Sequence, residues 1–70
     1  MVEIFSTNVE QQDQSSVLVQ ELLAHFPESK INFDLEDCDR ILRVEGESVS
    51  SGKIVEVLNG NGYQCSVLEK

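Results

Sequence analysis

The first half of the chain contains two patterns of hydrophobic and polar residues, one with the period of a strand and one with the period of a helix. Residues 2–8, VEIFSTN, are rich in β-forming residues, and Val2 and Ile4 alternate with polar neighbours, which predicts a strand. In residues 15–26, SSVLVQELLAHF, the hydrophobic residues recur at the spacing of one helix face. This pattern predicts an amphipathic helix that ends before Pro27.

The second half repeats the order of strand and helix. Residues 30–37, KINFDLED, alternate strictly, and the alternation resumes in residues 40–46, RILRVEG, after a break rich in aspartate. Two alternating runs around such a break predict a β-hairpin. Residues 51–59 have helical spacing with Ser50 as a plausible N-cap, and residues 63–69, YQCSVLE, predict a last strand.

These elements predict one α+β domain over residues 1–70, with the order strand, helix, strand, strand, helix, strand. Right-handed crossovers fold such a chain into a four-stranded antiparallel sheet with both helices on one face. We expect the spatial order fourth, first, third, second strand.

The charge of the chain narrows the classes of partner. Thirteen acidic residues against five Lys and Arg give a net charge of −8. An acidic surface repels phosphate groups, which disfavours binding to nucleic acid or to an anionic membrane, and favours cations or a basic protein partner. The chain has no apolar run long enough for a membrane span and no visible secretion signal, so we expect a cytoplasmic protein.

Two stretches resemble the heavy-metal-associated domain family, which has the ferredoxin-like fold of small copper chaperones. KIVEVLNGNGYQCSVLE, with its Gly62-Tyr63 pair, is similar to the family's second helix and last strand. KINFDLED is similar to the second strand, and the element order matches over all 70 residues. The resemblance implies a ferredoxin-like βαββαβ fold.

The metal loop of that family is degenerate in this sequence. The family carries Met-x-Cys-x-x-Cys between the first strand and the first helix, and these three ligand positions fall near Gln11, Asp13 and Ser16. Copper(I) prefers thiolate ligands, whereas a carboxylate and a hydroxyl are hard oxygen donors. The copper transfer that the resemblance implies is therefore not expected here, and we expect no cofactor.

Cys38 offers a different metal site, because it lies among carboxylates in the predicted hairpin turn. The predicted topology places this turn beside residues 9–14, so a weakly bound divalent or soft metal ion would have as ligands Cys38, Asp37, Asp39 and Asp13, with Glu10 and Glu36 nearby. The alternatives are a solvated acidic turn and a reactive thiol. Neighbouring carboxylates raise the pKa of a thiol, which favours the solvated turn.

The remaining reactive residue types do not form a catalytic set in the predicted topology. Cys65 alternates in register with Val67, so we expect it in the core, too far from Cys38 for a disulfide. His25, the one histidine, falls at the opposite end of the domain from Cys38, where it faces the negative end of the helix dipole. We therefore do not expect an enzyme.

The outer face of the sheet is a candidate contact surface. If Val2 and Ile4 face the helices, then Phe5, Ile41 and Leu68 point outward as a small apolar patch with a polar rim. Scattered exposed apolar residues are the alternative interpretation. Tyr63 is a further contact candidate beside residues 9–14, or else closes the core. We expect a non-enzymatic interaction module with an unknown protein partner, and a homodimer stays open. The alternative is a metallochaperone-like module that uses Cys38.

Overall fold

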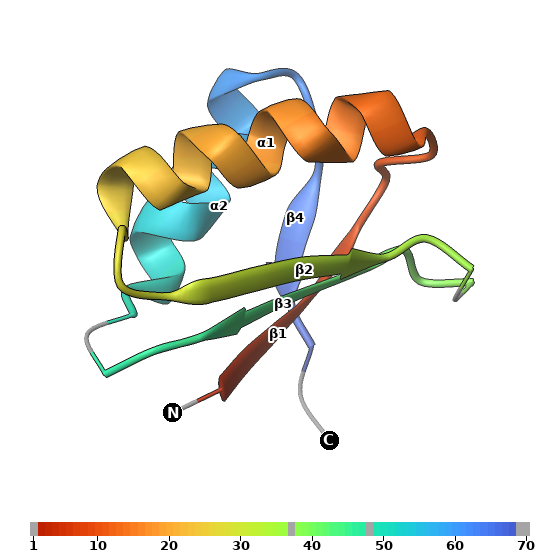
Figure 1. Cartoon of the computed structure of the whole chain (residues 1–70). Coiled ribbons are helices and arrows are strands. Elements are labelled where there is room, and N and C mark those ends of the chain that lie inside the picture. Colours follow the sequence, from red (N-terminus) through yellow and green to blue (C-terminus); the bar gives the residue numbers. More distant parts are fainter. Residues whose placement is uncertain (1, 37, 48, 69–70) are drawn as a thin grey trace.

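The chain folds into one four-stranded sheet with two helices, as a computed structural model shows (Figure 1). The structure describes residues 2–36, 38–47 and 49–68. The elements in chain order are β1 (Val2–Thr7), α1 (Gln12–His25), β2 (Lys30–Asp34), β3 (Ile41–Glu45), α2 (Ser51–Gly60) and β4 (Cys65–Val67). Both helices lie on the same face of the sheet, and the other face carries no helix (Figure 1).

The sheet has the order β2-β3-β1-β4, and every pairing is antiparallel. This confirms the predicted α+β class, the ferredoxin-like arrangement and the predicted spatial order. The turn between β2 and β3 lies at the end of the sheet where β1 passes into α1, because the amide and the hydroxyl of Thr7 at the end of β1 both donate hydrogen bonds to carbonyls of that turn.

The predicted orientation of β1 is wrong by one residue. Phe5 pairs with Leu42 on one side and Val67 on the other, and Phe5 and Leu42 are both fully buried under the helices. Ile4 pairs with Arg43 on the outer face instead. Side chains alternate along a strand, so burying the large aromatic ring of Phe5 turns Val2 and Ile4 outward.

The core lies between the sheet and the helices and is almost entirely aliphatic. Its fully or nearly fully buried members share contacts in one cluster, which comprises Phe5, Val9, Leu18, Leu22, Ile31, Leu42, Val44, Ile54, Val57, Leu58 and Cys65. Leu42 and Val44 on β3 and Leu18 and Leu22 on α1 are buried in it, in agreement with the alternation of residues 40–46 and the helical spacing of residues 15–26. Val9 was not predicted, because it stands alone in a polar segment.

Helix α1 begins earlier than its hydrophobic pattern suggests. Its N-cap is Gln11, whose backbone carbonyl accepts from the amide of Ser15 at 3.1 Å. The Gln14 side-chain oxygen accepts a hydrogen bond from the Gln11 amide at 3.3 Å and so satisfies one of the free donors at the helix start. The polar residues 12–14 therefore belong to the first turn of the helix.

Helix α2 has the ends that the sequence predicts. Ser50 caps it by accepting a hydrogen bond from the amide of Lys53 at 3.3 Å. After the helix, Gly62 has φ +89°, a conformation that glycine adopts readily, and the amide of Tyr63 bonds back to Leu58. Tyr63 and Gln64 follow this turn outside the sheet, so β4 starts at Cys65 and is shorter than predicted. Neither α1 nor α2 is long and apolar enough to cross a membrane.

Candidate functional site

The turn between β2 and β3 is fastened to the end of β1 by backbone and side-chain hydrogen bonds. The amide of Thr7 donates to the carbonyl of Asp39 at 3.1 Å, and its hydroxyl donates to the carbonyl of Arg40 at 2.6 Å. The same hydroxyl accepts from the amide of Val9 at 3.3 Å. Thr7 thus holds together the two segments that were predicted to form a metal site.

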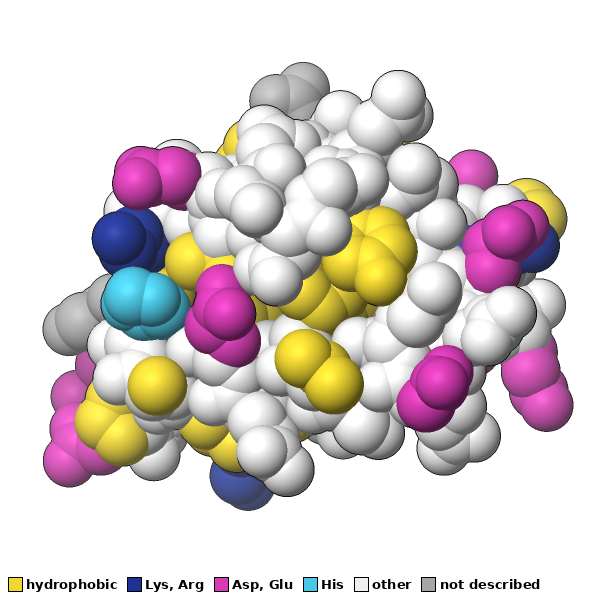
Figure 2. Space-filling view, turned by 90° about the horizontal axis from the view of Figure 1, so that it is seen from above, with side chains coloured by type: hydrophobic (Ala, Val, Ile, Leu, Met, Phe, Trp, Pro, Cys, Tyr) yellow, Lys and Arg dark blue, Asp and Glu magenta, His cyan; other side chains and the backbone are white. Residues whose placement is uncertain are grey.

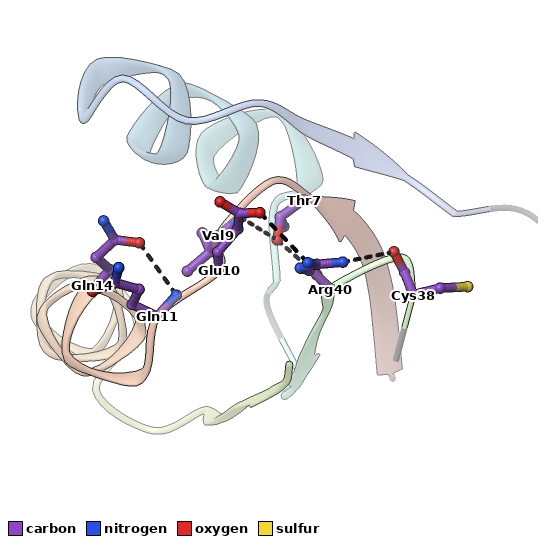
Figure 3. Close-up of polar contacts among 7 residues, drawn as sticks. All are labelled: Thr7, Val9, Glu10, Gln11, Gln14, Cys38 and Arg40. Carbon is purple, nitrogen blue, oxygen red and sulfur yellow. Dashed lines mark hydrogen bonds and ion pairs between the residues drawn. The ribbon is translucent and has the colours of Figure 1, made fainter. Parts of the chain in front are cut away.

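Arg40 occupies the middle of this end of the domain. Its guanidinium lies 3.5 Å from the carboxylate of Glu10 and also donates to the carbonyl of Cys38 at 3.2 Å (Figure 3). The Cys38 side chain is exposed and points away from both Glu10 and Arg40 (Figure 3). The chain therefore places its own cation between the thiol and the nearest loop carboxylate, and a positive charge there disfavours a metal ion.

The other predicted ligands do not converge on Cys38 in the described part of the chain. Asp13 lies in the first turn of α1, where its carboxylate accepts from the amide of Gln14 at 3.0 Å. Asp39 is exposed in the turn, and Asp37 lies outside the described residues. Within residues 2–36, 38–47 and 49–68, no group of three or more His, Cys, Asp or Glu side chains is arranged to hold a metal ion.

The acidic side chains do not gather on the helix-covered side of the domain. Seen from above the helices, they stand apart from one another, mostly around the rim of that face, with small hydrophobic areas between them (Figure 2). This distribution is typical of a surface that keeps a protein in solution.

Both cysteines are free, as expected from the distance between their strands. Cys65 is buried in the core, which confirms its predicted position. Burial raises the pKa of the Cys65 thiol to about 11, because the thiolate would lose its hydration. Cys65 is thus a protonated core residue at neutral pH, and a protonated thiol is a poor nucleophile.

His25 is the last residue of α1, at the opposite end of the domain from the β2–β3 turn (Figure 1). Its ring lies 6.5 Å from that of Phe26, and the two residues border an open depression with Glu28 and Glu47. His25 therefore has no access to Cys38 within one chain, as the sequence predicts.

The outer face of the sheet carries the most distinct surface feature. Ile4 on β1, Ile41 on β3 and Leu68 directly after β4 lie near one another and are each only half-buried. Leu68 is drawn to β1 by a hydrogen bond from its amide to the Ile4 carbonyl at 2.8 Å. These residues line a shallow depression together with polar and charged groups, which include Asn32, Asp34, Asp39, Arg43 and Glu45. We call this surface, defined by Ile4, Ile41, Leu68 and these five neighbours, the outer-face depression.

Two of the predicted contact residues lie in the outer-face depression and two do not. Ile41 and Leu68 are where the sequence placed them. Phe5 is in the core, so its predicted role as a contact residue is wrong, and Ile4 takes its place. Tyr63 lies on the helix side, where it packs against the core and borders a small depression with Val17.

Comparison with known proteins adds no relative. No protein-family model matches the sequence, and a search of curated proteins found no match.

Proposed function

We propose that this protein is a non-enzymatic binding module that contacts a protein partner through the outer-face depression. The observation that carries this proposal is the one-sided fold: both helices cover the same face of the sheet, and Ile4, Ile41 and Leu68 remain half-exposed on the other. An apolar centre with a polar rim is the composition of a protein contact surface.

The charges around the depression favour a basic partner. Asp34, Asp39 and Glu45 border it against a single Arg43, and the whole chain carries a net charge of −8. A partner with an apolar contact patch flanked by Lys or Arg would be attracted at long range and aligned at short range. Nucleic acids and anionic membranes lack this complementarity.

The module resembles a heavy-metal-associated domain that has lost its copper-binding thiols, and we propose that it descends from such a domain. The end of the domain that holds the metal in that family is here closed by the Arg40–Glu10 ion pair. This internal cation favours the proposed binding role over the metallochaperone alternative, because metal capture would have to displace it or work beside it.

A capture experiment with matched surface variants tests the proposal. The isotopically labelled protein is cross-linked in lysate of its own source cells, and the retained proteins are compared between wild type and Ile41→Asp. We expect the principal cross-linked protein to disappear with Ile41→Asp, because the new carboxylate enters the apolar centre of the depression. Its cross-linked segment should be rich in Lys or Arg.

Val17→Asp is the control for this experiment. Val17 is a β-branched residue on α1 with 63% of its surface exposed, so the same change on the helix side should leave the captured set unchanged. Amide spectra of both variants must show the native fold. A partner that survives Ile41→Asp, or one lost equally with Val17→Asp, contradicts the proposed surface.

A further inference from the structure

One edge of the sheet is open to pairing with another strand. β2 lies at the end of the order β2-β3-β1-β4 and has five residues, whereas the opposite edge strand β4 has three. An edge strand presents unpaired backbone amides and carbonyls that accept a further strand. β2 is therefore the longer of the two available pairing surfaces.

The sequence of β2 is complementary to itself when two copies run antiparallel. With Asn32 opposite Asn32, Lys30 of one copy faces Asp34 of the other, and this ion pair occurs twice because the arrangement is symmetric. Ile31 likewise faces Phe33 of the second copy. The five residues Lys-Ile-Asn-Phe-Asp thus place opposite charges together at both ends and apolar side chains together in between.

The orientation of these side chains suits that pairing. Lys30, Asn32 and Asp34 are exposed, whereas Ile31 and Phe33 turn toward the helix side and are more buried. Among the described residues, the side chains of Lys30 and Asp34 form no ion pair or hydrogen bond within the chain. Their charges are therefore available to a second copy.

The surface beside β2 would not oppose the approach of a second copy, although the chain is strongly acidic. The groove between the middle of β2 and α1 is lined by uncharged side chains, those of Gln12, Ser15, Ser16, Val19 and Gln20 on α1 with Ile31, Asn32 and Phe33 on β2, and carboxylates enter only toward the β2–β3 turn, at Asp34 and Glu36. A chain with thirteen acidic residues thus keeps this strip free of charge. Two such strips meeting across a two-fold axis bring no like charges together within β2, and the nearest opposed carboxylates in this register, Glu28 and Glu36, lie outside the strand.

We propose that the protein forms a homodimer through antiparallel pairing of β2 with β2, centred on Asn32. The two sheets then become one continuous sheet, with both α1 helices on one side and both outer-face depressions on the other. The dimer uses the backbone edge of β2, and the proposed function uses the apolar centre of the outer-face depression, which Asn32 and Asp34 only border. A dimer would present the depression twice to a bivalent partner.

Charge exchange between Lys30 and Asp34 tests the dimer. Dimerisation is measured by sedimentation velocity at about 0.15 M salt, where the Debye length is about 8 Å. Salt at this concentration screens the long-range repulsion between the acidic chains but leaves the interaction of directly opposed charges largely intact. We expect the dissociation constant of the wild-type dimer to lie between about 10 μM and about 1 mM, as for small, transient interfaces. K30D alone or D34K alone should dimerise at least about tenfold more weakly, because like charges then face each other at both ends of the strand pair.

The decisive sample is an equimolar mixture of the K30D and D34K chains. The two acidic side chains of the first chain then face the two lysines of the second, so a heterodimer should form where neither chain dimerises alone. A mixture that stays monomeric, or wild-type protein that stays monomeric at about 1 mM, overturns the proposal. E56K on the exposed surface of α2 is the control. It changes the net charge as D34K does and should dimerise like wild type.

Cysteine cross-linking tests the register. In a Cys38→Ser background, N32C places two thiols directly opposite each other, within the Cα separation that a disulfide spans. K30C is the control, since its two thiols would be four residues apart along the strands, about 13 Å. Mild oxidation should link N32C into a covalent dimer and leave K30C monomeric. Equal cross-linking of both variants, or of neither, overturns this register.

Discussion

The guanidinium of Arg40 lies 3.5 Å from the carboxylate of Glu10 and joins the β2–β3 turn to the loop before α1. The two residues lie at the end of the sheet where β1 passes into α1, beside the exposed Cys38. Arg40 also has φ +48°, the left-handed conformation that side chains rarely adopt outside glycine, asparagine and aspartate. The position therefore combines an internal cation with local backbone strain.

We predict that Arg40→Gly is more stable than Arg40→Ala by about 1 kcal/mol. Both variants lose the partly exposed ion pair, which contributes about 0.5 kcal/mol. Only glycine relieves the cost of the positive φ, so the difference between the variants isolates the backbone term. Urea unfolding followed by circular dichroism measures it, and equal stabilities would show that this residue is unstrained in solution.

Thr7→Val should lower the free energy of unfolding by about 1–2 kcal/mol. The valine keeps the shape of the side chain but removes the hydroxyl that donates to the carbonyl of Arg40 and accepts from the amide of Val9. Thr7→Ser retains the hydroxyl and serves as the control, with an expected loss below about 1 kcal/mol. If the two variants unfold at the same urea concentration, these hydrogen bonds do not hold the turn.

Phe5→Ala and Ile4→Ala should differ sharply in stability although the residues are adjacent. Phe5 is fully buried, so its truncation leaves a cavity and costs about 3 kcal/mol or more. Ile4 lies on the outer face, and its truncation should cost about 1 kcal/mol or less. Thermal unfolding of both variants tests the orientation of β1, and a larger loss for Ile4→Ala would restore the opposite orientation.

Cys65 should make the protein less stable in alkaline solution. The pKa of its thiol rises from 9.0 to about 11 on folding, so between these values the unfolded chain has lost a proton that the folded chain retains. The contribution is complete below pH 9 and is lost as the pH rises toward 11. At pH 10 the loss should be about 1 kcal/mol relative to Cys65→Ala, which lacks the thiol but keeps Tyr63 and the lysines. If the free energies of unfolding of wild type and Cys65→Ala differ by the same amount at pH 8 and at pH 10, the burial of Cys65 is contradicted.

The architecture could be predicted from the sequence because most elements have an unambiguous period. Ile31, Phe33 and Leu35 alternate without exception, and Ser50 and Gly62 mark the limits of α2 and its turn. The orientation of β1 was ambiguous, since Ile4 and Phe5 are both apolar and occupy opposite faces. Packing of Phe5 between Leu42 and Val67 decided it, and that information is not local.

The candidate site was less predictable than the fold. The sequence grouped Cys38 with carboxylates by proximity along the chain, but it did not indicate that Arg40 would turn back between Cys38 and Glu10. The positive φ of Arg40 that permits this arrangement follows from tertiary contacts with Thr7. Conversely, Ile41 and Leu68 were assigned correctly to the outer face, because the alternation of β3 and β4 was clear.

A metal titration tests most directly the claim that this fold acts through protein contacts and not through a metal ion. The reduced protein is titrated with zinc and with copper(I) while backbone amide resonances are recorded, with Cys38→Ser as the control. The account predicts no saturable shift at micromolar metal for residues 10–16 or 36–39, since Arg40 places a positive charge beside Glu10 and Cys38. Micromolar binding that shifts both segments and is lost in Cys38→Ser would contradict it.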